Sequence, residues 1–143
     1  MDKMQAFITK RLLMPERVVE DGVVLIQHGR ILAAGKQENI PIPADAQVTD
    51  FGNDYVSPGF VDIHTHGSKG TFCEDSVDAT LSHAGHLCQG GTTAFLPTMS
   101  TPKGPSVFIG AMQRQQAEGF QGAQVAGLHM EGPFLTPKGF EGA

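Results

Sequence analysis

Hydrophobic and polar positions in the first 56 residues form short β-prone runs separated by turn signals. The apolar and β-branched runs predict strands at 5–8, 17–20, 23–27, 30–35 and 47–51. Asp21-Gly22 and His28-Gly29 separate neighbouring runs closely enough to predict two hairpins. Residues 1–56 are therefore expected to form a small all-β unit that ends at Ser57-Pro58-Gly59.

After this turn the pattern changes to strand, helix, strand, helix, strand. Apolar runs predict strands at 60–64, 92–97 and 124–130, and apolar positions three and four apart predict helices at 78–89 and 106–118. Asp75 or Ser76 is the expected N-cap of the first helix, and Gly90-Gly91 ends it. Strands that alternate with helices of this length indicate βαβ units with a parallel sheet. The chain is thus predicted to be an α/β protein with two domains, residues 1–56 and 57–143.

Potential metal ligands stand at the ends of two of these strands. His64 ends the first of these strands and His66 lies two residues further on, and residues two apart project to the same side of a strand. Glu131 ends the third strand, and the carboxyl ends of parallel strands meet at one edge. Two imidazoles and a carboxylate suit a divalent metal that keeps one position open for water. The pattern therefore predicts metal-assisted hydrolysis.

Other polar residues carry weaker signals. His129 lies two residues before Glu131 and faces the same side, so geometry alone allows it as a ligand. His83 and His86 are three apart on the first helix, where a solvated face is expected. Cys73 and Cys88 lack CxxC spacing and are predicted to be reduced, without an assigned function.

Composition narrows the class of protein. Hydrophobic residues make up 40% and charged residues 17%, which is typical of a globular chain. The net charge of −5, with scattered Lys and Arg, argues against a nucleic-acid partner. No apolar run approaches the roughly 20 residues of a membrane span, and the first residues lack a signal peptide's apolar region. We therefore expect a cytoplasmic protein that binds neither nucleic acid nor membrane.

Three segments resemble a known group of enzymes. Residues 58–67, PGFVDIHTHG, resemble the first-strand signature of the amidohydrolase superfamily. Residues 91–98, GTTAFLPT, and 129–134, HMEGPF, resemble the N-acetylglucosamine-6-phosphate deacetylase family within it. The resemblance extends over essentially the whole chain. It implies a partial (β/α)8 TIM barrel, namely its first three βα units, preceded by part of a small β-sandwich.

The resemblance also implies an activity and its residues. The family removes the acetyl group from N-acetylglucosamine 6-phosphate with one or two divalent ions, Zn or Fe. Glu131 matches the family's metal-binding glutamate. His64 and His66 match a histidine pair that is present in those members of the family able to hold a second metal. His129 is expected on the substrate side, and Ala143 falls where the family contacts substrate. A homodimer is expected for the complete enzyme.

The family's two later metal-binding histidines and its catalytic aspartate have no counterpart before Ala143. No catalytic general base is therefore assigned in this chain. We expect it to be the amino-terminal portion of a longer enzyme and to be inactive by itself.

Two other functions stay open at this point. A dihydroorotase- or hydantoinase-like amidohydrolase characteristically uses a carbamylated lysine where this chain has Glu131, and the next lysine after the third strand is Lys138. The second alternative is a truncated, non-catalytic interaction module.

Overall fold

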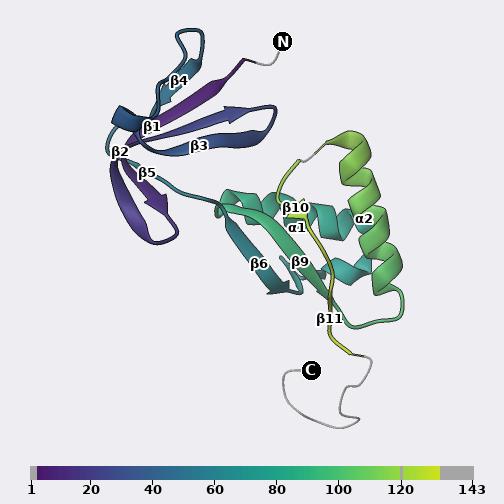
Figure 1. Cartoon of the computed structure of the whole chain (residues 1–143). Coiled ribbons are helices and arrows are strands. Elements are labelled where there is room, and N and C mark those ends of the chain that lie inside the picture. Colours follow the sequence, from purple (N-terminus) through teal and green to yellow (C-terminus); the bar gives the residue numbers. More distant parts are fainter. Residues whose placement is uncertain (1–2, 120, 133–143) are drawn as a thin grey trace. The chain divides into compact units, whose positions relative to one another are not determined.

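The chain divides after Pro58 into two units (Figure 1). Each unit has its own buried hydrophobic residues. The computed structural model describes residues 3–119 and 121–132. The described part of the first unit contains strands and one 3-10 turn, whereas the second unit alternates strands and helices. The structure thus confirms the mixed α/β class.

The first unit is built on a five-stranded sheet in the order β3-β2-β1-β4, with β5 also paired to β1. β1 is antiparallel to β2 and parallel to β4 and β5. Consecutive residues of β2 alternate between two hydrophobic clusters, with Val23 and Leu25 in one and Val24 in the other. Apolar side chains therefore cover both faces of this sheet. Its elements are β1 (Gln5–Met14), β2 (Arg17–Gln27), β3 (Arg30–Lys36), the 3-10 turn η1 (Gln37–Asn39), β4 (Gln47–Asp50) and β5 (Tyr55–Val56).

One of the two predicted hairpins is confirmed and the other is wrong. His28 and Gly29 have positive φ and connect β2 to β3, as the turn signal predicts. Asp21-Gly22, in contrast, lies inside β2, and the β1–β2 strands turn at 15–16. Gly22 is needed there because a Cβ atom would lie 2.3 Å from the Cβ of Leu12 on the neighbouring strand. The glycine marks close strand packing rather than a turn.

The second unit confirms the predicted alternation of strands and helices. The predicted third strand, 124–130, is two short strands separated by three residues, and a small hairpin, β7–β8, follows the first strand unpredicted. The elements are β6 (Phe60–Thr65), β7 (Gly67–Ser68), β8 (Thr71–Phe72), η2 (Cys73–Asp75), α1 (Val77–Gln89), β9 (Thr92–Met99), α2 (Gly104–Glu118), β10 (Gln124–Val125) and β11 (His129–Met130).

Both helices pack against the sheet through one hydrophobic core. α1 begins at Ser76, whose hydroxyl accepts the N–H of Ala79, and ends at Gly90. Phe95 and Met99 of β9 are fully buried in this core, together with Ala84 of α1 and Ala111 of α2. β9 therefore contributes the largest fully buried side chains to the core of the second unit.

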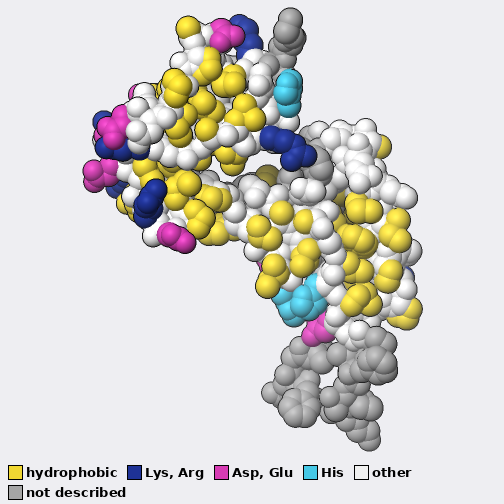
Figure 2. All heavy atoms as spheres, in the orientation of Figure 1, with side chains coloured by type: hydrophobic (Ala, Val, Ile, Leu, Met, Phe, Trp, Pro, Cys, Tyr) yellow, Lys and Arg dark blue, Asp and Glu magenta, His cyan; other side chains and the backbone are white. Residues whose placement is uncertain are grey.

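Every strand paired to β9 is parallel to it, so their carboxyl ends share one edge. β6 pairs with β9, and β10 and β11 both pair with β9 as well. Within the described residues β6 has no second neighbour, and Phe60, Val61 and Ile63 are 71%, 61% and 64% exposed. Hydrophobic side chains are correspondingly visible on the surface of this unit (Figure 2).

Candidate metal centre

Two strand ends deliver the candidate ligands to one place. β6 runs directly into His66, and β11 runs directly into Glu131. The backbone N–H of Glu131 donates to the carbonyl of Met99 at 3.1 Å, which continues the β11–β9 pairing by one residue. Thr65 pairs with Pro97 on β9. The pairing of β6 and β11 with β9 therefore sets the positions of His66 and Glu131 relative to each other at the carboxyl edge of the sheet.

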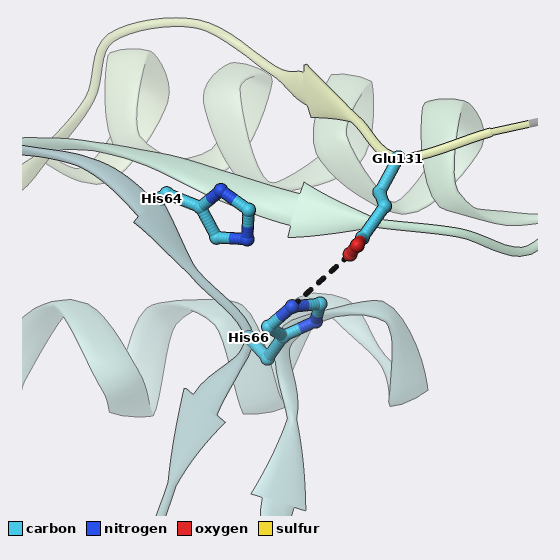
Figure 3. A group of neighbouring side chains, drawn as sticks. All are labelled: His64, His66 and Glu131. Atoms are coloured by element: carbon cyan, nitrogen blue, oxygen red, sulfur yellow. Dashed lines mark ion pairs between the residues drawn. The ribbon is translucent and has the colours of Figure 1, made fainter. Parts of the chain in front are cut away.

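The three predicted ligands converge (Figure 3). Each of His64, His66 and Glu131 offers one donor atom, and these atoms all lie within 4.8 Å of one another. His66 Nε2 lies 3.2 Å from Glu131 Oε2, and the two imidazole centroids are 5.4 Å apart. Within residues 3–119 and 121–132, this is the one cluster of at least three His, Cys, Asp or Glu side chains close enough to share an ion.

An irregularity of β6 shapes the backbone at His64. Between Asp62 and Thr65 three steps along β6 match two along β9, so the strand register shifts. Within this stretch Asp62 Oδ1 accepts the backbone N–H of His64 at 3.1 Å. Such shifts re-aim side chains next to functional sites. Asp62 supports the backbone of a candidate ligand.

A backbone hydrogen bond and a glycine constrain the chain at His66. The carbonyl of His66 accepts the N–H of Cys73 at 2.6 Å. The next residue, Gly67, has φ of 146°, and a Cβ atom there would lie 2.1 Å from the carbonyl oxygen of Thr71. Only glycine fits this position, which lets the β7–β8 hairpin fold tightly behind His66.

His129 contacts the site from β11. Its Nδ1 lies 3.0 Å from the carbonyl oxygen of Ile63, and its ring centroid lies 4.4 Å from that of His64. A carbonyl only accepts hydrogen bonds, so Nδ1 carries the proton and Nε2 keeps its lone pair in the neutral ring. The side chain of His129 thus links β11 to β6, and in its neutral form its Nε2 can accept a hydrogen bond.

His83 differs from its sequence-based prediction. It is 4% exposed rather than solvated, and burial lowers its pKa below 6.5. Its Nε2 lies 3.0 Å from Thr65 Oγ1 and its Nδ1 lies 3.0 Å from Ser68 Oγ. The missed signal is helical spacing, because His83 shares a face with the buried Thr80 and Ala84. The remaining site prediction, Ala143, lies outside the described residues.

The donor set fits a divalent cation. Two imidazole nitrogens and a carboxylate oxygen are ligand types that Zn²⁺ and Fe²⁺ take. Nitrogen and oxygen ligands lie about 2.0–2.2 Å from the centre of such an ion, so two ligands of one ion lie at most about 4.4 Å apart. The three donor atoms here, all within 4.8 Å of one another, are close to that arrangement. The side chains of His66 and Glu131 are 45% and 24% exposed, so solvent reaches the cluster.

A sequence profile described as the Amidohydrolase family matches residues 55–142. The chain belongs to this family. The match begins at β5 and includes the strands that position His64, His66 and Glu131.

Individual amidohydrolases similar to the chain confirm the resemblance seen in its motifs. The N-acetylglucosamine-6-phosphate deacetylase of Bacillus subtilis (strain 168) is 30% identical over 136 residues, covering 89% of the chain and 33% of that protein. The N-acetylgalactosamine-6-phosphate deacetylase of Escherichia coli O157:H7 is 33% identical over 134 residues, covering 90% of the chain and 33% of that protein. The crystal structure of N-acetylglucosamine-6-phosphate deacetylase from Pasteurella multocida matches with a TM-score of 0.74 and 26% identity, over 94% of the chain and 35% of that structure.

The chain therefore spans about a third of the length of these amidohydrolases. Among the described residues, no helix is both long enough and apolar enough to cross a membrane.

The contact between His129 and Ile63 predicts a tautomer. In nitrogen-15 spectra of the folded chain, the neutral form of His129 is expected to carry its proton on Nδ1 and not on Nε2. Long-range proton–nitrogen correlation spectra distinguish the two nitrogens, and a His129→Gln variant assigns the signals. A ring protonated at Nε2 alone would contradict the contact.

Proposed function

We propose that this chain forms the amino-terminal part of a metal-dependent deacetylase that acts on N-acetylglucosamine 6-phosphate and yields glucosamine 6-phosphate and acetate. The observation that carries the proposal is the convergence of two imidazoles and one carboxylate at the carboxyl edge of a parallel sheet. Active sites of α/β proteins form at that edge.

His64, His66 and Glu131 are the proposed ligands of one or two divalent ions, Zn or Fe. When bound, such an ion acidifies a water molecule and polarises the amide carbonyl of the substrate. His66 Nε2 and Glu131 Oε2 lie 3.2 Å apart, a separation at which both atoms could ligate one ion.

His129 is proposed to face the substrate. Its Nδ1–H is held by the Ile63 carbonyl, which fixes the ring and leaves Nε2 directed away from that bond. An acceptor nitrogen fixed in this way suits a hydroxyl or amide N–H of the sugar. Ala143 is a further proposed substrate contact, on the resemblance alone.

The sugar itself is chosen on motif resemblance. One relative is named for the glucosamine derivative and the other for its galactosamine epimer, and the two identities, 30% and 33%, do not separate them. The epimers differ in one ring hydroxyl, so rates on both phosphorylated sugars decide the assignment. Faster release of acetate from N-acetylglucosamine 6-phosphate is expected.

We further propose that residues 57–143 are the first three βα units of a (β/α)8 barrel and that residues 1–56 belong to a β-sandwich. Among the described residues β6 is paired along one edge only, and this edge and its exposed side chains support the arrangement, because a closed barrel covers both. The general base and remaining ligands are proposed to lie outside these 143 residues. The homodimer and the cytoplasmic location stay predictions.

Two alternatives make different predictions. A dihydroorotase- or hydantoinase-like enzyme would depend on a carbamylated lysine, whereas the ligand position after β11 is Glu131. An interaction module would need no metal at all. Metal binding by the chain favours the deacetylase over the module.

Metal binding by the 143-residue chain is predicted to depend on Glu131. Glu131→Gln keeps the shape but removes the charge, so the affinity for Zn²⁺ is expected to fall at least about tenfold. The same loss is expected for His64→Asn combined with His66→Asn. Equilibrium dialysis with elemental analysis measures both, and Glu118→Gln on the exposed face of α2 is the matched control. Unchanged stoichiometry in the site variants would refute the ligand assignment.

Deacetylation is predicted to need more than these residues. The 143-residue chain with Zn²⁺ or Fe²⁺ is expected to release no acetate above background, since lack of a positioned base costs about 10²–10⁴-fold. The longest reading frame that contains the chain is expected to be active and to lose activity with Glu131→Gln. Turnover by the 143-residue chain at ordinary enzyme rates would contradict the proposal.

A further inference from the structure

A buried imidazole contacts the segment that contains the candidate ligand His66. His83 of α1 is 4% exposed, and its ring packs edge-on against Phe95 with centroids 5.5 Å apart. Both ring nitrogens are engaged, Nε2 with Thr65 Oγ1 and Nδ1 with Ser68 Oγ, each at 3.0 Å. Burying an imidazole is costly unless its nitrogens find such partners. These two bonds fix the ring in one orientation.

The two hydroxyl partners bracket a candidate ligand. Thr65 is the residue before His66, and Ser68 is two residues after it. His83 therefore ties both ends of the segment 65–68 to α1 by side-chain bonds. The backbone bond from Cys73 to His66 is a third attachment of the same segment.

The His66 side chain needs this support because little else holds it. Its side chain is 45% exposed, and within the described part of the chain it contacts Glu131 at 3.2 Å and the ring of His64. An exposed imidazole aims its nitrogen only as well as its backbone is fixed. We propose that His83 is a positioning residue that holds residues 65–68 so that His66 Nε2 faces Glu131.

Hydroxyl partners suit this role for a neutral ring. A neutral imidazole donates from one nitrogen and accepts at the other, and a hydroxyl can do either. Ser68 Oγ also lies 3.3 Å from His86 Nδ1, so the chain of bonds continues along α1. An apolar side chain of similar size would fill the same space but would leave Thr65 and Ser68 without these bonds.

This inference rests on the proposed metal site, and its test is a double-mutant cycle on metal binding. Zn²⁺ affinity of the 143-residue chain is measured by competition with a chromophoric chelator, and the Co²⁺ absorption spectrum reports the ligand geometry. His83→Leu is expected to weaken Zn²⁺ binding by about tenfold and to change the Co²⁺ spectrum. In a His66→Asn background His83→Leu is expected to have no further effect.

Conservative and control variants separate positioning from general folding. His83→Asn keeps a polar group within reach of Ser68 and is expected to restore most of the lost affinity. Ser82→Leu, at an exposed position of the same helix, is the matched control and is expected to leave binding nearly unchanged. If His83→Leu fails to fold, Thr65→Val and Ser68→Ala remove the same bonds from the other side and are expected to weaken binding.

The outcomes distinguish the two proposals. If the unaltered chain binds no Zn²⁺, the proposed function fails. If Glu131→Gln weakens binding but His83→Leu, or the pair Thr65→Val and Ser68→Ala, does not, only the positioning role is overturned. An equal effect of His83→Leu with and without His66 would also overturn it, because the loss would then not pass through that ligand.

Discussion

The pairing of two strands on opposite edges of β9 is the constraint on which the candidate site depends. β6 pairs through Thr65 with Pro97, and β11 pairs through only two residues, His129 and Met130. The bond from Glu131 to the Met99 carbonyl extends the second pairing to the ligand itself. Because successive side chains of a strand point to opposite faces, a shift of register by one residue would turn Glu131 to the other face and separate it from His66.

The core beneath the sheet makes this pairing stable. Phe95 and Met99 of β9 are fully buried against α1 and α2, so the strand shared by both pairings is also the most firmly packed. Each large buried side chain of this kind contributes about 1.5–3 kcal/mol to folding. The candidate ligands His66 and Glu131 are 45% and 24% exposed, so their burial contributes less to that stability. A cation that bound only the folded chain would add to it by mass action.

Local sequence signals predicted where helices and turns begin and end, but they did not predict the contacts between strands. The helix cap at Ser76, the stop at Gly90 and the turn at His28-Gly29 depend on neighbouring residues alone, and the structure confirms them. Asp21-Gly22 misled because the reason for Gly22 is a side chain ten residues away, Leu12.

The sequence predicted which residues form the candidate site, but it did not predict the neighbouring residues that contact them. Strand periodicity and the family motifs identified His64, His66 and Glu131, and the structure places them together. The register shift at 62–65 and the burial of His83 depend on how β6 and α1 pack, which no short motif records. Those features lie beside His64 and His66 in the structure.

The most direct test of the account is the X-ray absorption spectrum of the chain loaded with one equivalent of Zn²⁺. Imidazole ligands give characteristic multiple scattering, so the account predicts a nitrogen and oxygen shell at about 2.0–2.1 Å that includes about two histidines. The histidine signal should disappear with His64→Asn and His66→Asn together. A Zn²⁺ shell without imidazole scattering, or one that this double variant leaves unchanged, would contradict the claim that these strand ends form a metal centre.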